Sequence, residues 1–202
     1  FTLPALERLS RASAEARVGT RIVVLAPTRE LAFQVRGVMG RIAGAVGLTT
    51  VALVGGLPMR SDQTGLRRKP NVVVATPGRL LDHIERRSVD LSRVAVVVLD
   101  EADRMLDLGF IPQVYRILAT TPERRQTMLF SATIPVHIAN LGHKHLQPPV
   151  KVEVGGDYAT PAVGADQAVL FVSSEQKLPL LLALLREEPG TCLVFVETKV
   201  EA

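Results

Sequence analysis

The sequence predicts an α/β fold in which helices cover both faces of a parallel β-sheet. Short apolar runs rich in Val, Ile and Leu recur along the chain. They lack the polar–apolar alternation of a strand with one face in water. Segments with apolar residues at helical spacing follow most of these runs, and this alternation is typical of a doubly wound sheet. Hydrophobic residues make up 47% of the 202 residues, which is ample for a core and argues against disorder.

The apolar runs define the strands that we expect in the main sheet. They are residues 21–26, 50–54, 71–75, 94–99, 126–130 and 150–154. Thr28 and Thr76 are the expected N-caps of two of the helices that follow, and Pro77 suits the first position of its helix. Two further helices are expected at residues 111–119 and 136–145.

Composition along the chain predicts one domain and part of another. Residues 1–154 contain the main sheet, and residues 155–165, rich in Gly, Pro and Ala, resemble a linker. Residues 166–202 are expected to begin a second α/β domain. Its expected elements are a strand at 167–172, a helix at 175–187 and a strand at 191–196.

The run at residues 94–99 ends in three acidic residues, Asp100, Glu101 and Asp103. Side chains at the carboxyl end of a buried parallel strand point into the crevice where α/β proteins bind ligands. There Asp100 could hold Mg²⁺, directly or through water. Glu101 could act as a general base on a water that attacks a phosphate. Alternatively, these acids only cap the next helix, because acidic residues are favoured at helix N-termini.

Residues 100–110 read DEADRMLDLGF, which resembles motif II of the DEAD-box RNA helicases together with its usual tail. Four more segments follow the order and spacing of that family. They are PTREL at 27–31 (motif Ia), GG at 55–56, TPGR at 76–79 (motif Ib) and SAT at 131–133 (motif III). Residues 195–199 are similar to motif IV, so the resemblance covers essentially the whole chain.

The resemblance implies a RecA-like fold and ATP-dependent local unwinding of RNA duplexes in the cytoplasm. It implies that Asp100 holds Mg²⁺, possibly through water, and that Glu101 positions or deprotonates the water that attacks ATP. Asp103 would bond Ser131 and Thr133 and so link the nucleotide site to domain closure.

The resemblance also implies a set of residues that grip the sugar–phosphate backbone of RNA. Such a grip reads shape and charge and not base identity. The residues are Pro27, Thr28, Arg29, Gly55, Gly56, Thr76 and Arg79.

The sequence departs from the family pattern because it lacks two motifs that bind ATP. The sequence contains no G-x-x-x-x-G-K-[ST] and no adenine-reading Q motif. We therefore expect an internal fragment that is inactive alone, within an intact protein that is an RNA-stimulated ATPase. The alternative is a nucleotide-independent RNA-binding or clamp module. A DNA helicase is disfavoured by DEAD in place of DEAH or DEXH, together with PTREL and TPGR.

Composition adds a few bounds. The net charge of +4 permits a polyanionic partner without proving one. The single cysteine, Cys192, lies in an apolar run and is expected to be a buried core residue and not a nucleophile. No disulfide can form within the chain, which suits a reducing compartment. The apolar runs are too short to span a membrane. His137, His143 and His145 lack the spacing of metal ligands.

Overall fold

The computed structural model describes residues 1–146, 148–154, 166, 168–187, 190–196 and 198. The chain divides into two compact units, Phe1–Val154 and Gly155–Ala202, which are considered separately below. None of the helices in the described part of the chain is long and apolar enough to cross a membrane.

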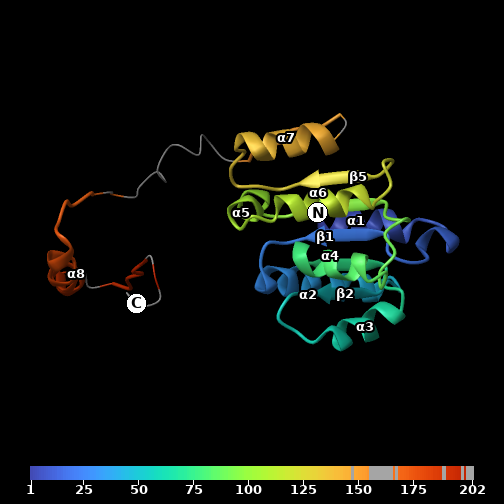
Figure 1. Ribbon diagram of the computed structural model, residues 1–202, viewed down its shortest axis with the longest axis horizontal. Coiled ribbons are helices and arrows are strands. Elements are labelled where there is room, and N and C mark those ends of the chain that lie inside the picture. Colours follow the sequence, from blue (N-terminus) through green and yellow to red (C-terminus); the bar gives the residue numbers. More distant parts are fainter. Residues whose placement is uncertain (147, 155–165, 167, 188–189, 197, 199–202) are drawn as a thin grey trace. The chain divides into compact units, whose positions relative to one another are not determined.

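The first unit contains a five-stranded parallel sheet, and this confirms the predicted α/β class. The strands lie in the order β2-β3-β1-β4-β5 (Figure 1). All residues of β1, β3 and β4 are buried, which explains why their sequences are uninterrupted runs of Val, Ile, Leu and Ala. The bounds are β1 Ile22–Leu25, β2 Thr50–Leu53, β3 Val72–Ala75, β4 Val96–Leu99 and β5 Gln126–Leu129.

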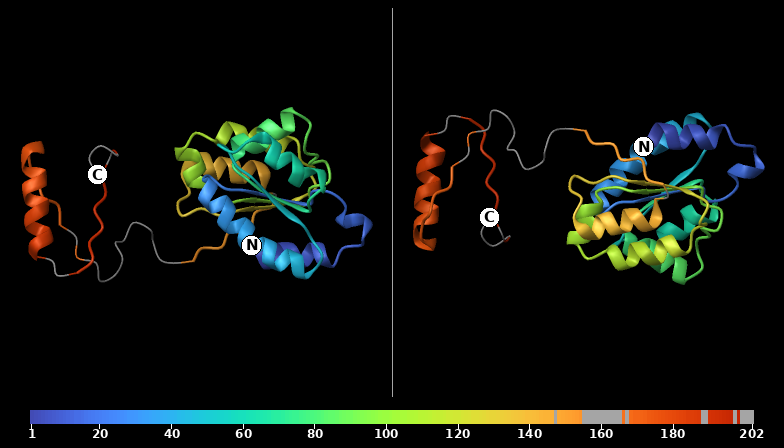
Figure 2. Two further views of the ribbon diagram at one scale, coloured as in Figure 1. Left: turned by 90° about the horizontal axis from the view of Figure 1, so that it is seen from below. Right: turned by 90° about the horizontal axis from the view of Figure 1, so that it is seen from above.

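Helices cover both faces of this sheet (Figure 2). Helices α1 (Thr2–Ser10) and α2 (Arg29–Ala45) pack on one face, and a short 3₁₀ turn, Glu15–Arg17, follows α1. Five helices contribute buried side chains to the core on the other face. They are α3 (Met59–Arg67), α4 (Pro77–Glu85), α5 (Ala102–Asp107), α6 (Ile111–Ala119) and α7 (Val136–His145).

The prediction of a strand at residues 150–154 is wrong. This segment is described but is not part of the sheet. Val150 and Val152 are 89% and 78% exposed, so the apolar side chains that suggested a last strand of the sheet do not pack on it. An apolar run forms a strand only where a neighbouring strand completes the ladder.

The described part of the second unit contains one regular element, α8 (Ser174–Glu187), which confirms the predicted helix. The described residues of the two predicted strands, 168–172 and 191–196, are not strands. Residue 167 and the predicted linker at 155–165 lie outside the described residues.

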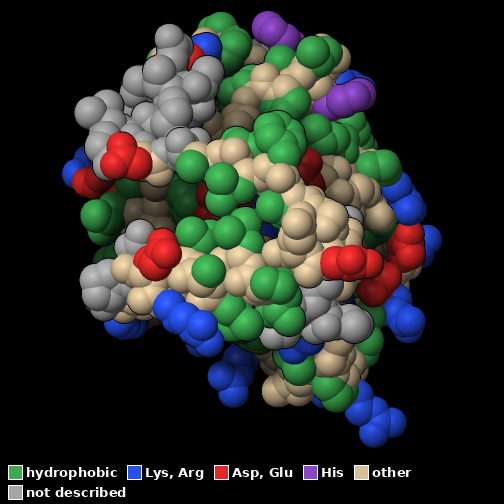
Figure 3. All heavy atoms as spheres, turned by 90° about the vertical axis from the view of Figure 1, so that its left-hand side faces the viewer, with side chains coloured by type: hydrophobic (Ala, Val, Ile, Leu, Met, Phe, Trp, Pro, Cys, Tyr) green, Lys and Arg blue, Asp and Glu red, His purple; other side chains and the backbone are tan. Residues whose placement is uncertain are grey.

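None of the described residues of the second unit is buried. Phe171 and Phe195 are 96% and 90% exposed, and Figure 3 shows hydrophobic side chains over much of the visible surface. Cys192 is exposed, which corrects the expectation of a buried core cysteine. Among the described residues of this unit, no other element buries these apolar runs, so the structure does not show a second RecA-like domain.

Candidate functional site

The predicted site residues of the first unit lie in the loops that follow the five strands or in the first turn of the helices after those loops. Because the strands are parallel, their carboxyl ends meet at one edge of the sheet, where α/β proteins bind ligands. In Figure 1 the arrowhead of β5 marks this edge, on the left of the sheet. The structure therefore brings together motifs that are up to about a hundred residues apart in the sequence.

The loop after β4 holds Asp100 and Glu101. The amide of Asp100 donates to the carbonyl of Leu25 at the end of β1, and the amide of Ala102 donates to the carbonyl of Phe130 after β5, both at 3.0 Å. Glu101 has φ 49° and ψ 56°, a left-handed conformation that is uncommon outside glycine and is often found at functional sites. Its side chain makes no capping hydrogen bond to α5, which argues against a purely capping role.

Asp100 is partly buried at the end of β4. Desolvation, followed by repulsion from the neighbouring Glu101 carboxylate, raises the pKa of Asp100 above its ordinary value. A bound cation would relieve both effects, and a carboxylate oxygen suits Mg²⁺. Among the described residues, no group of three or more His, Cys, Asp or Glu side chains could hold a metal.

Asp103 connects the loop after β4 with the loop after β5. Its Oδ2 accepts hydrogen bonds from the Thr133 amide at 2.9 Å and from the Thr133 hydroxyl at 3.0 Å. Its own amide donates to Ser131 Oγ at 3.1 Å, and the Ser131 hydroxyl donates to the Thr133 carbonyl at 2.6 Å. Partial desolvation acts to raise the pKa of Asp103, but hydrogen bonds from Thr133, Arg104 and Ser131 outweigh it, so the pKa is lowered.

The loops after β1 and β2 meet at Arg29 and Gly56. Thr28 caps α2 by accepting the Leu31 amide at 3.2 Å, as predicted, and Arg29 begins the helix. Gly56 has φ +77°, and a Cβ added there would lie 2.6 Å from Arg29 Nη1. The guanidinium therefore lies directly against the Gly55–Gly56 turn, which only glycine permits at this position.

The predicted RNA-binding residues differ in exposure. Thr28, Arg29, Gly55 and Gly56 are partly or fully exposed. The three remaining residues of the set, Pro27, Thr76 and Arg79, are buried.

The start of α4 agrees only in part with the sequence prediction. Thr76 occupies the N-cap position, and Pro77 lies in the first turn of the helix, as predicted. The Thr76 side chain makes no capping hydrogen bond, which corrects its predicted role as a cap.

Arg79 belongs to a buried polar cluster that the sequence analysis did not identify. Its Nε donates to Asp62 Oδ2 at 2.7 Å, and its Nη2 donates to the Leu57 carbonyl at 2.7 Å. His83 Nε2 lies 3.0 Å from the same Asp62 oxygen. One signal was available, because Met59, Asp62 and Leu66 are spaced to share a helix face, and an acid on such a face needs a partner.

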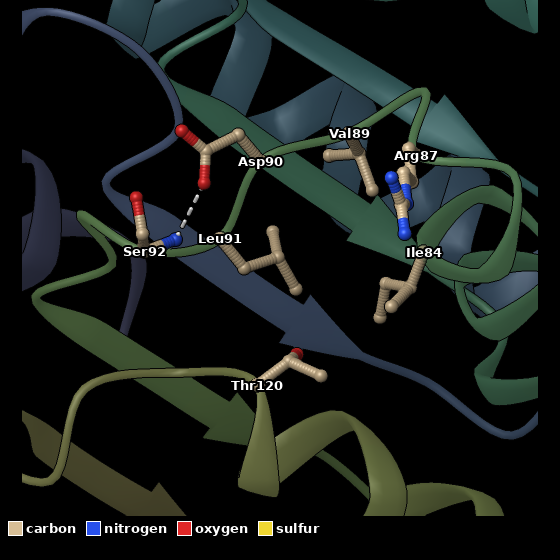
Figure 4. Close-up of a pocket in the computed structure, with 7 residues that line it drawn as sticks. All are labelled: Ile84, Arg87, Val89, Asp90, Leu91, Ser92 and Thr120. Carbon is tan, nitrogen blue, oxygen red and sulfur yellow. Dashed lines mark hydrogen bonds between the residues drawn. The ribbon is translucent and has the colours of Figure 1, made fainter.

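A cavity of about 340 Å³ lies elsewhere, in the loop that precedes β4 (Figure 4). Asp90 accepts the Ser92 amide at 2.9 Å beside this cavity, and Ile84, Leu91 and Thr120 also line it. It lies toward the amino ends of the strands and contains none of the predicted site residues.

Comparison with known families agrees with this geometry. The model of the family described as "DEAD/DEAH box helicase" matches residues 1–141 of this chain. The chain belongs to that family. In the order predicted from the sequence, motifs Ia, GG, Ib, II and III follow strands β1, β2, β3, β4 and β5.

Several curated DEAD-box relatives are about equally similar. The "ATP-dependent RNA helicase DbpA" of Escherichia coli is 41% identical over 182 residues, which cover 89% of this chain and 39% of that protein. The "ATP-dependent RNA helicase DeaD" of Mycobacterium tuberculosis is 41% identical over 201 residues, covering 98% of this chain and 34% of that protein. The DEAD-box chain thus spans well under half the length of these relatives.

Two solved structures resemble the DEAD-box chain. The yeast DEAD-box splicing factor Prp28 aligns with a TM-score of 0.69 at 31% identity, covering 77% of this chain and 39% of that one. A hypothetical ATP-dependent RNA helicase from Sulfolobus tokodaii aligns with a TM-score of 0.65 at 35% identity, covering 73% and 41%. At these identities the likeness supports the family as well as the fold.

Proposed function

We propose that the intact protein is an ATP-dependent RNA helicase that couples ATP binding and hydrolysis to local unwinding of RNA duplexes. The observation that carries this proposal is the junction of the loops after β4 and β5. There the acid-bearing loop of motif II is bonded through Asp103 to the hydroxyl-bearing loop of motif III. A phosphate-dependent change at Asp100 and Glu101 would therefore be passed to the neighbouring loop.

In this proposal Glu101 orients and deprotonates the attacking water, because it stands beside Asp100 at the ligand-binding edge and is not occupied as a helix cap. Asp100 would hold Mg²⁺, which neutralises charge on the phosphates when it is bound. The residues that would cradle the phosphates themselves are not in this sequence, since it contains no G-x-x-x-x-G-K-[ST].

The same edge would bind RNA through its backbone. Thr28 and Arg29 begin α2, whose N-terminal amides and positive end of the dipole favour a phosphate. Gly55 and Gly56 let a nucleic-acid backbone approach the loop after β2 closely. Phosphate and sugar contacts carry little sequence information, so the proposed binding is independent of base sequence.

The proposal is tested on the full-length protein by measuring phosphate release with and without single-stranded RNA, and strand separation of a short labelled RNA duplex. We expect RNA to stimulate phosphate release and ATP to be required for strand separation. RNA binding without ATP turnover in the full-length protein would refute the helicase proposal. This chain by itself is expected to release no phosphate above background.

A nucleotide-independent RNA clamp is the second candidate, and it would apply if the full-length protein also lacked a phosphate-binding loop. The two candidates differ in how RNA affinity responds to ATP. A helicase of this type should bind single-stranded RNA more tightly when a non-hydrolysable ATP analogue is present. A clamp should show the same affinity with and without the analogue.

A further inference from the structure

Three buried polar side chains connect α3 and α4 beneath the loop that contains Gly55 and Gly56. Asp62 on α3 is 4% exposed, whereas Arg79 and His83 on α4 are 9% and 0% exposed. Asp62 Oδ2 accepts from Arg79 Nε at 2.7 Å and lies 3.0 Å from His83 Nε2. One buried carboxylate is therefore shared by the side chains of an arginine and a histidine.

A buried charged cluster is in general a weak source of stability. Burying an ion pair costs desolvation energy that the attraction between the charges often only offsets, and apolar residues of similar size are frequently as good. The surroundings offer an apolar solution, because Leu66 and Leu80 from the same two helices belong to the hydrophobic core on this face. A charged cluster in this place therefore suggests a requirement for geometry, which a planar guanidinium with fixed donors supplies.

The second donor of Arg79 shows where that geometry is used. Its Nη2 donates to the carbonyl of Leu57 at 2.7 Å, so one guanidinium bridges Asp62 and the residue that follows Gly56. Arg29 also lies against this loop, at Gly56. The glycine turn thus contacts two arginines, of which Arg79 donates a hydrogen bond to the turn and is itself bonded to a buried acid.

His83 and Ser88 complete the support. His83 Nδ1 lies 2.7 Å from Ser88 Oγ, and the Ser88 hydroxyl also lies 3.0 Å from the His83 carbonyl. These contacts fix the plane of the ring, and the ring in turn fixes the direction of the Asp62 carboxylate.

We propose that Asp62 is a positioning residue for RNA binding, and this inference rests on the proposed function. Asp62 orients Arg79, and Arg79 holds the Leu57 carbonyl so that the turn at residues 55–57 keeps its place beside Arg29. Arg79 contributes to RNA binding through this loop and not through a contact with phosphate, because its side chain is buried and its Nε and Nη2 already donate within the protein.

The test uses the full-length protein with Asp62→Asn, a labelled single-stranded oligouridine and fluorescence anisotropy. Asparagine removes the charge and leaves Arg79 and His83 without a shared carboxylate. We expect the affinity for RNA to fall about tenfold, which corresponds to about 1.4 kcal/mol of binding free energy. Binding of a fluorescent ATP analogue should be unchanged. Hydrogen exchange should accelerate at the amides of residues 55–57.

Two control variants separate positioning from stability. Leu66→Ala removes a buried side chain from the same helix and core without a polar contact, so it should lower the melting temperature and leave RNA affinity unchanged. Asp82→Asn removes an exposed acid from α4 and should change neither quantity. If Asp62→Asn fails to fold, Arg79→Lys replaces it. Lysine keeps one contact with Asp62 but lacks the fork that reaches Leu57, and it should reproduce the RNA defect.

The proposal is overturned if Asp62→Asn binds RNA as the unaltered protein does, or if Leu66→Ala weakens RNA binding to the same degree. If the unaltered protein does not bind the oligouridine at all, the proposed function fails. The exchange rates of residues 55–57 then still decide whether Asp62 holds the glycine turn.

Discussion

The Asp103 carboxylate accepts two hydrogen bonds from Thr133, one from its amide at 2.9 Å and one from its hydroxyl at 3.0 Å. The two residues follow different strands, β4 and β5, which are neighbours in the sheet. Thr133 does not cap α7, because that helix begins at Val136 after Pro135 and has no side-chain cap. The contact therefore joins two loops and is not part of a helix start.

Ser131→Ala combined with Thr133→Ala should weaken unwinding by the full-length protein more than ATP hydrolysis. The double variant removes one of the two Thr133 donors and the Ser131 oxygen that accepts the Asp103 amide, but no group that could attack a phosphate. Melting temperature, RNA-stimulated ATPase and strand separation measured on the same preparation test this expectation. A parallel fall in all three would show a loss of stability and not of coupling.

Glu101→Gln should leave ATP and RNA binding in place while hydrolysis falls by about 10²–10⁴-fold, the usual contribution of a general base. Glutamine keeps the shape of the side chain but cannot take a proton. Binding isotherms and single-turnover phosphate release measure the two effects separately. Asp107→Asn, an exposed acid on α5, is the matched control and should hydrolyse ATP normally. Near-normal turnover in Glu101→Gln would exclude Glu101 as the base.

Gly56→Ala should weaken RNA binding more than Gly55→Ala does. At Gly56 the backbone has φ +77°, and a new Cβ would press on the Arg29 guanidinium, which must then move. At Gly55 a Cβ would meet nothing within 4 Å. Anisotropy with single-stranded RNA compares the two variants. Equal affinities would mean that the contact between Arg29 and the glycine turn does not shape the RNA site.

Asp100→Asn should raise the melting temperature at neutral pH, on the order of 2 °C. The pKa of Asp100 is raised in the folded state, so the native protein binds this proton more tightly than the unfolded chain, and stability falls as the pH rises through that region. Asparagine removes this cost. Below the ordinary Asp pKa of about 4 both states are protonated, and the advantage of the variant should disappear.

Asp103→Asn should have the opposite effect and lower the melting temperature at neutral pH. The pKa of Asp103 is lowered in the folded state, so its stabilisation is present above the ordinary Asp pKa and is lost as the pH falls through the folded value. Thermal melts of both variants between about pH 2 and pH 8 cover the window in which carboxylates titrate. Shifts of the same sign at neutral pH would contradict this assignment of the two carboxylates.

The buried strands and the acidic loop were predictable because they depend on local pattern. Uninterrupted runs such as residues 94–99 indicate a strand covered on both faces, and parallel strands place their ends at one edge. The segment at 150–154 shows the limit of this reasoning. Its apolar residues suggested a strand, but a strand exists only with a partner, and the sequence pattern alone does not identify the partner.

The polar cluster around Asp62 could not be assigned from sequence for a similar reason. Asp62 and Arg79 are 17 residues apart and on different helices, so their meeting depends on how α3 and α4 pack. The motif at 76–79 suggested an arginine that points outward to RNA. Whether a long charged side chain points outward or is buried depends on whether the interior offers a group of opposite charge.

The position of β5 has a practical consequence for handling this chain. Among the described strands, β5 pairs on one side only, with β4, and Phe130 and Ile134 just beyond it are 41% and 53% exposed. Such an edge offers unpaired amides and carbonyls beside apolar side chains, which favours pairing between copies of a chain and, at high concentration, precipitation. Dilute preparation, with light scattering followed as a function of concentration, should therefore precede any binding measurement on the isolated chain.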